Sequence, residues 1–287
     1  MSLSVSCVIL TMGDRPVDLD RAIASVVAQQ GDPVQIVVVG NGADVPNLPP
    51  GVQLLRLAEN VGIPAGRNAG VAETSGELVL YLDDDGWLPE TGAMEQIRAD
   101  FAADARLGIV ALRIADPETG ATARRHVPRL RASDPRESGA VTTFLGGAAV
   151  ARRAMLDQCG GLPDRFFYAH EETDLAWRAL DAGWAIRYDA EVLMYHPATV
   201  PSRHASYYRM NARNRVWLAR RRLPWPLVPV YLGVWVALTV ARTRSPSLLR
   251  IWAKGFVEGW RSDAGERRPM SWRTVARMTR LGRPPII

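Results

Sequence analysis

Three consecutive carboxylates, Asp83, Asp84 and Asp85, stand directly after an apolar run at residues 78–82. Such a run is typical of a buried strand, so the acids are expected at the end of a strand. Neighbouring carboxylates repel one another, and the cluster costs stability unless a cation or a fixed donor compensates the charge. Mg²⁺ and Mn²⁺ bind oxygen ligands of this kind together with substrate phosphates. The cluster therefore indicates either a divalent-metal site or a solvated acidic turn.

A second group of acids, Glu171, Glu172 and Asp174, follows His170 at the predicted start of a helix that ends near Gly183. A carboxylate can act as a general base by taking the proton from an attacking hydroxyl. Acids in a first helical turn also complement the helix dipole, and this explanation needs no chemistry. If both groups are functional, metal binding and proton transfer come from separate elements of the chain.

Two further pairs of residues could contact a substrate. Arg67 and Asn68 are expected in the first turn of a small helix over residues 65–74, where a guanidinium and free backbone N–H groups can meet a phosphate. An arginine on a solvated helix start is the alternative. Gly146 and Gly147 are small residues at which the backbone can approach a ligand closely.

A polar segment at residues 115–140 has no periodicity and many turn-forming residues. Long irregular segments in compact domains are usually functional, so we expect a loop near the active site. His126 within it fits an ordinary loop histidine better than a metal ligand.

Strands and helices alternate around these residues. A β-branched strand at residues 4–11 is followed by a helix with an apolar stripe and by a second strand at residues 35–39. This βαβ opening implies parallel pairing. Further strands are predicted at residues 52–57, 78–82, 107–114, 184–188 and 192–195, and further helices at residues 89–103 and 152–158. The pattern predicts an α/β protein with a mixed, mostly parallel sheet flanked by helices.

The charge of the chain is divided unevenly along its 287 residues. Residues 1–199 carry 17 Lys and Arg against 27 Asp and Glu, whereas residues 200–287 carry 18 against 3. We therefore predict an acidic domain over residues 1–200 and a basic helical C-terminal region over residues 201–287. The basic region suggests a polyanionic partner, and the acidic domain argues against nucleic acid.

Residues 223–241 form a stretch of 19 residues without a charge, flanked by arginines. This length could just span a bilayer of about 30 Å, but Pro224, Pro226 and Pro229 interrupt its first half. An in-plane or re-entrant membrane-associated segment is favoured over a full span, and a buried soluble helix is the third possibility. The tryptophans among the basic residues that follow, Trp252, Trp260 and Trp272, suit the same membrane interface.

The N-terminal sequence has no basic region of the kind that begins a signal peptide, and Asp14 and Arg15 follow soon after the first apolar residues. Cys7 and Cys159 form neither a disulfide framework nor a CxxC metal pattern. We therefore expect the protein at the cytoplasmic face of the membrane, either peripheral or with one apolar segment.

The order of these segments resembles the family 2 glycosyltransferases of the GT-A fold, which make bacterial cell-surface glycans. The resemblance spans residues 3–220 and is nearest to rhamnosyl and galactofuranosyl transferases. It rests on SVSCVILT, QIVVVGNGA, ENVGIPAGRNAGV, YLDDDGWLPE, LGGAAVARRAML, GGLPDRFFYAHEETDLAWRALDAGW and EVLMYHP. It implies a Rossmann-like sheet, a nucleotide-sugar donor, and Mg²⁺ or Mn²⁺ as cofactor.

The resemblance also implies roles for the acidic triplet at the strand end. Asp85 would hold the metal ion, and Asp83 or Asp84 would contact the donor nucleotide. Asp83 is a second candidate metal ligand. His196 stands where several members of the family supply a further one.

Glu172 stands where the family has its catalytic base, although the usual residue there is aspartate, which leaves Glu171 and Asp174 as rivals. Arg67 and Asn68 match a segment that lines the donor pocket. Many relatives have Asp-Asn-Gly-Ser where this chain has Gly40-Asn41-Gly42-Ala43, so a carboxylate that often helps to bind the base is missing. Asn41 and the Gly146–Gly147 pair remain candidates for substrate binding.

The leading hypothesis is a metal-dependent, inverting hexosyltransferase that acts on a hydroxyl of a lipid-linked or cell-envelope glycan. A nucleotidyltransferase that makes a nucleotide sugar is the second hypothesis, although the phosphate loop of that class is absent. A non-catalytic, membrane-bound glycan-binding protein is the third.

Overall fold

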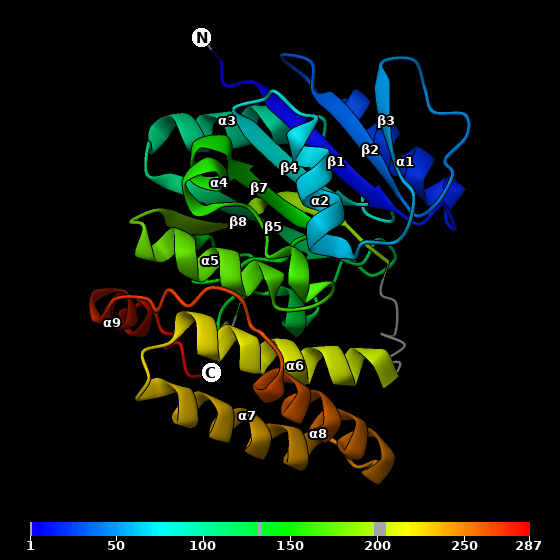
Figure 1. The fold of residues 1–287 in the computed structure, drawn as a ribbon. Coiled ribbons are helices and arrows are strands. Elements are labelled where there is room, and N and C mark those ends of the chain that lie inside the picture. Colours follow the sequence, from blue (N-terminus) through cyan, green and yellow to red (C-terminus); the bar gives the residue numbers. More distant parts are fainter. Residues whose placement is uncertain (1, 131–133, 198–204) are drawn as a thin grey trace.

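One mixed sheet organises the protein, as Figure 1 shows for a computed structural model that describes residues 2–130, 134–197 and 205–287. The order of the strands in the sheet is β3-β2-β1-β4-β7-β5-β8-β6. The strands are β1 (Val5–Thr11), β2 (Gln35–Asn41), β3 (Val52–Leu57), β4 (Leu78–Asp83), β5 (Leu107–Ala115), β6 (Gly139–Ala140), β7 (Ala148–Arg152) and β8 (Ala185–Tyr195).

Strands β1 to β4 are parallel to one another, and β5 is parallel to β8. β7 is antiparallel to both β4 and β5, so it joins the two parallel parts, and β6 is antiparallel to β8 at the edge. The predicted class, a mostly parallel α/β sheet flanked by helices, is confirmed.

Alternating residues of the strands point to the two faces of the sheet, and each face has its own apolar core. Val8 of β1 packs in the core beneath α2, α4 and α5, whereas Cys7 and Ile9 pack in the core beneath α1 and α3. Gly70 of α2 lies directly on Val8, where a side chain would collide. The helices are α1 (Pro16–Val27), α2 (Ile63–Ala72), α3 (Ala93–Ala103), α4 (Arg153–Cys159) and α5 (Glu171–Asp181).

Four further helices follow and cover α5 on the side away from β3 (Figure 1). Val216 and Leu218 of α6 are buried in the same apolar core as Leu175 of α5. Helix α8 crosses α6 closely, since a Cβ atom at Gly259 would lie 2.7 Å from the carbonyl oxygen of Arg213. These helices are α6 (Ala205–Arg222), α7 (Leu227–Arg242), α8 (Pro246–Arg261) and α9 (Trp272–Arg280). The predicted boundary at residues 200/201 lies outside the described residues.

Two details differ from the sequence prediction. The strands predicted at residues 184–188 and 192–195 are one strand, β8. The pairing with β5 shifts between Asp189 and Leu193, so the residues between them bulge out of the ladder. Trp252 was expected at a membrane interface, but it is buried and stacks on Phe256 with 5.2 Å between the ring centroids.

The apolar stretch at residues 223–241 largely forms α7, which begins after Pro224 and Pro226. Val228, Tyr231 and Leu232 are buried against the core, so one face of this helix has a protein partner. Across the described residues, none of the helices combines the length and the apolar character needed to cross a bilayer.

Candidate active site

The carboxyl ends of the central strands meet at one edge of the sheet, where ligands bind in open α/β sheets. Asp83 ends β4, Thr11 ends β1 and Asn41 ends β2. The segment after β4 is held to the end of β8, because Trp87 and Tyr195 exchange backbone hydrogen bonds of 3.0 and 2.8 Å. The ends of β1, β2 and β4 and the end of β8 therefore meet at the acidic cluster.

Each of the three adjacent carboxylates has a cationic or hydrogen-bonding partner. Arg15 forms ion pairs with Asp84, at 2.7 Å, and with Asp85. A guanidinium nitrogen of Arg67 lies 2.7 Å from Asp83 Oδ1. Asp84 and Asp85 are buried. Because arginines pair with these carboxylates and two of the three are buried, the cluster differs from a solvated acidic turn.

Asp83, Asp85 and His196 fit a divalent cation. One ligand atom from each lies within 4.8 Å of the others. His196 Nε2 lies 3.1 Å from Asp85 Oδ1. Burial opposes ionisation of Asp85, but the hydrogen bond from His196 and nearby positive charge lower its pKa on balance. Carboxylate oxygens suit Mn²⁺ or Mg²⁺, whereas an imidazole nitrogen suits transition-metal ions.

Asp84 differs from its neighbours. Burial raises its pKa to about 6, although the Thr11 hydroxyl and Arg15 favour the charged form. It lies with Thr11 in the wall of a cavity. Asp84 is not one of the three potential metal ligands, so its position agrees better with the predicted contact to the donor nucleotide.

Gly146 and Gly147, predicted to let the backbone approach a ligand, lie between the two acidic groups. The backbone N–H of Asp83 donates to the carbonyl of Gly147 at 3.1 Å, and a side chain at Gly147 would overlap the Asp83 carboxylate. The N–H of Gly146 donates to Glu172 Oε1 at 3.3 Å. The pair before β7 thus brings the acid of β4 beside the acid of α5.

Glu171 and Glu172 are both less acidic than a free glutamate. Burial, and then the charge of Glu172, raise the pKa of Glu171 to about 8. Burial also raises the pKa of Glu172, although Arg67 opposes this effect. A carboxyl whose pKa is raised toward neutrality can exchange a proton, which is what a general base requires.

Two cavities adjoin at the acidic cluster. We call the one lined by Thr11, Asn41 and Asp84 the β1-side cavity, with a volume of about 470 Å³. The other, lined by Glu171 and Glu172, is the α5-side cavity, with about 570 Å³. Both are lined by Ile63, Arg67, Asp83, Tyr168 and His196. Two of the potential metal ligands, Asp83 and His196, therefore lie where the two cavities meet, whereas Asp85 lines only the first cavity and Glu172 only the second.

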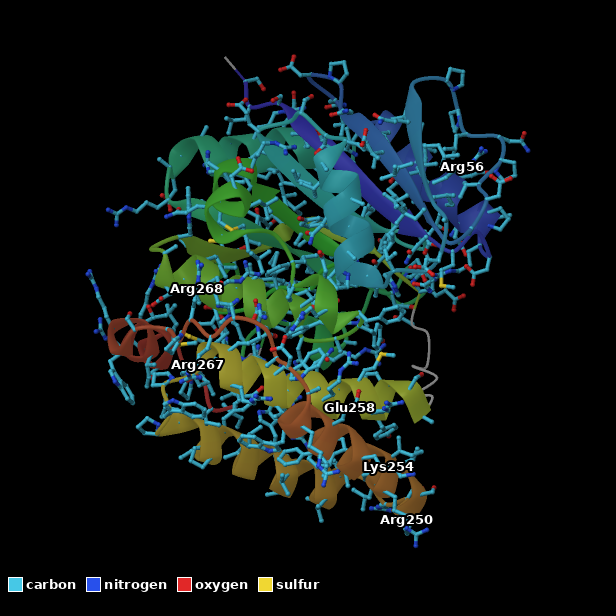
Figure 2. The ribbon with its side chains drawn as sticks, in the orientation of Figure 1. Arg56, Arg250, Lys254, Glu258, Arg267 and Arg268 are labelled. Atoms are coloured by element: carbon cyan, nitrogen blue, oxygen red, sulfur yellow. The ribbon has the colours of Figure 1, made fainter. Side chains whose placement is uncertain are left out.

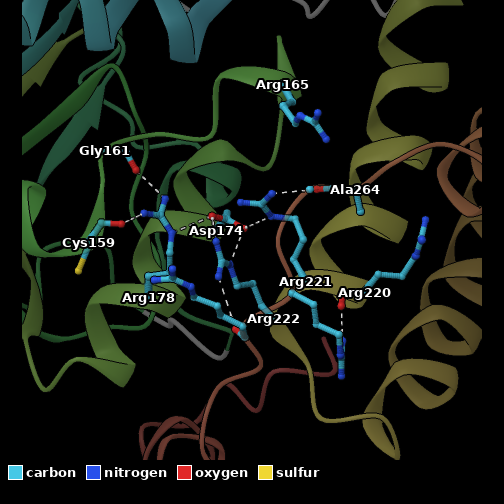
Figure 3. Close-up of polar contacts among 12 residues, drawn as sticks. Cys159, Gly161, Arg165, Asp174, Arg178, Arg220, Arg221, Arg222 and Ala264 are labelled. Carbon is cyan, nitrogen blue, oxygen red and sulfur yellow. Dashed lines mark hydrogen bonds and ion pairs between the residues drawn. The ribbon is translucent and has the colours of Figure 1, made fainter.

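Asp174, a rival for the role of base, lies elsewhere. Its side chain is fully buried and accepts from Arg178, Arg221 and Arg222 at 2.9, 3.1 and 2.8 Å (Figure 3). Burial opposes its ionisation, but the three arginines lower its pKa on balance. It lines neither cavity. Asp174 therefore joins α5 to α6 and has no route to a substrate.

Asn68 is also outside the two cavities. Its side-chain amide donates to the carbonyl of Leu162 at 2.7 Å and to Asp164 Oδ1 at 2.6 Å, and it accepts from the N–H of Leu162 at 3.0 Å. These hydrogen bonds use the side-chain amide of Asn68, the residue predicted to line the donor pocket. Asn41 lines the β1-side cavity and accepts from the N–H of Val61 at 2.9 Å.

Asn214 of α6 contacts the loop before Glu171, and the sequence offered no sign of it. Its side-chain N–H₂ lies within hydrogen-bonding distance of three carbonyls, those of Phe166, Tyr168 and Ala169, at 2.8, 2.7 and 2.9 Å. Ala169 and the next residue both have φ of 71°, a left-handed conformation that costs energy outside glycine. Asn214 therefore stabilises the strained loop that presents the acids of α5.

Arg15 was also missed. In the sequence it served only as evidence against a signal peptide, although its position just after β1, the neighbour of β4, was a usable signal. His126 lies in the predicted loop near the site, with its ring centroid 6.4 Å from that of His196. Burial lowers the pKa of His126 to about 4, so its ring is neutral at pH 7.

Comparison with known proteins agrees with the family resemblance noted in the sequence. Residues 6–160 match the family model described as Glycosyl transferase family 2. A curated relative from Mycobacterium tuberculosis, Pre-mycofactocin glycosyltransferase, is 28% identical over 153 residues. The match covers 50% of this chain but only 32% of the relative, so this chain aligns with less than half of that protein.

Solved structures share the fold at low sequence identity. TarS of S. aureus (residues 1–349) has a TM-score of 0.64 at 14% identity, covering 90% of this chain and 81% of that one. GalNAc-T7 with UDP, GalNAc and Mn²⁺ also has a TM-score of 0.64 at 14% identity, covering 92% and 57%. The mannosyltransferase PcManGT of Pyrobaculum calidifontis with GDP-Man and Mn²⁺ has 0.58 at 15%, covering 98% and 84%.

Proposed function

Because the chain belongs to glycosyl transferase family 2, we propose that it transfers a hexose from a nucleoside-diphosphate sugar to a hydroxyl of a lipid-linked or cell-envelope glycan. The observation that carries this proposal is the approach of Asp83 and Glu172 across the Gly146–Gly147 pair. Asp83 and His196 line both cavities and Glu172 lines the α5-side cavity, an arrangement that suits transfer between two substrates.

The β1-side cavity is the proposed donor site. Asp83, Asp85 and His196 would hold Mn²⁺ or Mg²⁺ there, and the bound ion supplies charge neutralisation for the departing diphosphate. Arg15 and Arg67 place two guanidinium groups at the same acids. The similar solved structures of other proteins that contain GDP-Man or UDP-GlcNAc support a nucleoside-diphosphate sugar as donor. A rhamnosyl or galactofuranosyl donor is the finer proposal from the sequence.

The α5-side cavity is the proposed acceptor site, and Glu172 is the proposed base. It lies at the wall of this cavity, where it can take the proton of the attacking hydroxyl. One displacement of this kind inverts the anomeric carbon and needs no covalent nucleophile. Burial and the charge of Glu172 raise the pKa of Glu171, which favours its protonated form and supports Glu172 as the base.

The C-terminal helices supply the proposed contact with the cytoplasmic face of an anionic membrane. Trp225 and Val240 near the two ends of α7 are 58% and 59% exposed. Figure 2 shows Arg250 and Lys254 on α8, on the side of the molecule away from the sheet. Exposed apolar side chains beside cations favour an anionic lipid surface.

A vesicle assay tests this contact. Replacing Arg250 and Lys254 together by Gln should weaken binding to vesicles that contain phosphatidylglycerol, and should leave the weak binding to phosphatidylcholine unchanged. Arg56→Gln is the matched control, because Arg56 is exposed on β3 at the other end of the molecule (Figure 2). Equal binding of all three proteins to anionic vesicles would contradict the proposed surface.

The central experiment is a panel of nucleotide sugars with Mn²⁺, scored by release of nucleoside diphosphate. Wild type should release it with one or a few donors and should lose activity on chelation. Asp85→Ala should lose activity too, whereas Asp44→Ala, an exposed acid, should not. Pyrophosphate formed from a nucleoside triphosphate and a sugar phosphate would instead indicate a nucleotidyltransferase, and binding without turnover would indicate a glycan-binding protein.

A further inference from the structure

A small cavity extends from the α5-side cavity toward the C-terminus of the chain. Its volume is about 90 Å³, and it shares Thr143, His170, Thr173 and Arg283 with the larger cavity. Arg215 of α6 and the aromatic residues Tyr231 and Trp235 of α7 complete much of its wall. We call this space the arginine pocket. Among the described residues, its lining contains no aspartate or glutamate.

The guanidinium of Arg215 is buried, with an exposed fraction of 7%. It donates to the Tyr231 hydroxyl at 3.1 Å and stacks on Trp235, with 3.5 Å between its central carbon and the ring centroid. Burial lowers the pKa of Arg215, and the groups that oppose this effect are tyrosines. A buried cation usually has an anionic partner, and within the described residues Arg215 has no carboxylate partner.

Arg283, from the C-terminal segment, is a second cation in the wall of the arginine pocket. Burial lowers its pKa, and Arg124 and Arg215 lower it further because they carry like charge. Arg124 itself lies in the wall of the adjoining α5-side cavity. The Asp174 cluster also contains three arginines, but there a buried carboxylate balances them. In the arginine pocket, none of the described side chains in the wall supplies such an anion.

His170 contributes a buried polar atom at the boundary between the pocket and the α5-side cavity. Its Nε2 atom is buried and has no hydrogen-bond partner among the described residues. Burial, and then Arg215, hold the pKa of His170 well below its usual value, so the ring is neutral. A buried polar atom without a partner is costly, and a ligand that bonds to it removes that cost.

We propose that the arginine pocket binds a phosphoryl group of the acceptor. The inference rests on the proposed function, since it takes the α5-side cavity to be the acceptor site. Arginine forks match phosphoryl oxygens, and a dianion balances Arg215 and Arg283 better than a carboxylate would. The hydroxyls of Thr143 and Thr173 in the shared wall add donors. The acceptor class is therefore a phosphate-bearing glycan or lipid.

The pocket is tested by calorimetry with inorganic phosphate in the presence of a chelator, so that neither donor nor metal takes part. Wild type should bind phosphate saturably, and Arg283→Gln should weaken binding at least about tenfold, as expected for a lost charge-assisted contact. Arg280→Gln is the matched control: it removes the same charge from an exposed position that lines neither the arginine pocket nor the α5-side cavity. Absent phosphate binding, or equal weakening in both variants, would overturn the proposal.

A second variant keeps the test valid if Arg283→Gln does not fold. Arg283→Lys retains the positive charge but loses the planar fork, so phosphate should bind with intermediate affinity. Folding of each variant is checked by the affinity for nucleoside diphosphate with Mn²⁺, which should equal that of wild type. Phosphate affinity of Arg283→Lys equal to that of wild type would contradict recognition through the guanidinium.

Two competitors distinguish the sources of the phosphoryl group. Dodecyl phosphate in detergent represents a lipid phosphate, and glucose 1-phosphate represents a soluble sugar phosphate. Tighter competition by the first supports a lipid-linked acceptor, and tighter competition by the second supports a soluble one. If neither displaces inorganic phosphate, the acceptor role is overturned. Because these measurements need no sugar transfer, they can succeed while the donor panel fails, and the reverse also holds.

Discussion

Glu172 and Asp174 lie two positions apart on α5 and have opposite surroundings. Residues at this spacing point about 200° apart around a helix. Glu172 lies at the α5-side cavity and accepts from the N–H of Gly146, whereas Asp174 is enclosed by three arginines of α5 and α6 (Figure 3). One acidic group in the sequence is therefore divided between a chemical site and a structural one.

The two carboxylates also differ in how readily they hold a proton. Burial raises the pKa of Glu172, and the arginines lower the pKa of Asp174 despite its burial. A raised pKa suits proton exchange, while a lowered one keeps the charge fixed. The comparison shows that the charges of neighbouring residues, more than burial or residue type, determine whether a carboxylate suits the role of a base or that of a fixed partner in an ion pair.

The largest expected effect is on catalysis. Glu172→Gln removes the proposed base but keeps the size of the side chain and its hydrogen bond from Gly146, so we expect kcat to fall by roughly 10²–10⁴-fold. The rate of sugar transfer measures this effect, and the affinity for nucleoside diphosphate should be unchanged. Retention of the wild-type kcat would remove Glu172 from the mechanism.

The next effect is on stability. Asp174→Asn leaves Arg178, Arg221 and Arg222 without their shared anion, so we expect a loss of about 3–5 kcal/mol in the free energy of unfolding. Denaturant titration measures it, with the exposed residue Asp157 changed to Asn as control. The folded fraction should still transfer sugar at the wild-type rate. A catalytic defect in stable protein would instead place Asp174 in the chemistry.

The same comparison predicts a pH dependence for Asp174. Its folded pKa is below the unfolded one, so its contribution is present above the unfolded pKa and is lost as the pH falls through the folded value. Asp174→Asn should therefore flatten the acid limb of the stability curve. An unchanged acid limb would contradict the ion-pair assignment.

A smaller effect tests Asn68, which was predicted to bind the donor but instead holds Leu162. Asn68→Ala leaves the buried backbone groups of Leu162 without these partners, so we expect a loss of about 1–3 kcal/mol in stability. Donor affinity should change less than about twofold, because Asn68 lines neither cavity. A selective loss of donor affinity without destabilisation would restore the original prediction.

The smallest effect at neutral pH is expected from Glu171→Gln, because Gln resembles the protonated form already present. With a folded pKa of about 8 and an ordinary value of 4.5 in the unfolded chain, the folded protein holds the extra proton between these values. Wild-type stability should therefore fall as the pH rises through this interval. The variant should show a shallower fall in thermal midpoint, and an equally steep fall would place the titration elsewhere.

Much of the site could be predicted from local patterns. Asp83 to Asp85 were predicted at the end of an apolar strand, and the resemblance to the family implied that Asp85 and His196 hold the same metal ion; their side chains are found 3.1 Å apart. Gly146 and Gly147 were expected where a backbone approaches closely, and they separate two acidic side chains. Strand β8 was split in two because its bulge resembles a turn in sequence.

Residue types and their order determined the α/β fold class, the mostly parallel sheet and the acidic strand end, because these depend on periodicity and on neighbours along the chain. Tertiary structure alone decided which acid of α5 faces a cavity. Two of the three arginines that bind Asp174, Arg221 and Arg222, come from α6, as does the amide of Asn214 that supports the loop before Glu171, and these contacts join residues 45 to 48 positions apart. Contacts at that separation follow from helix packing, which leaves no pattern in the local sequence.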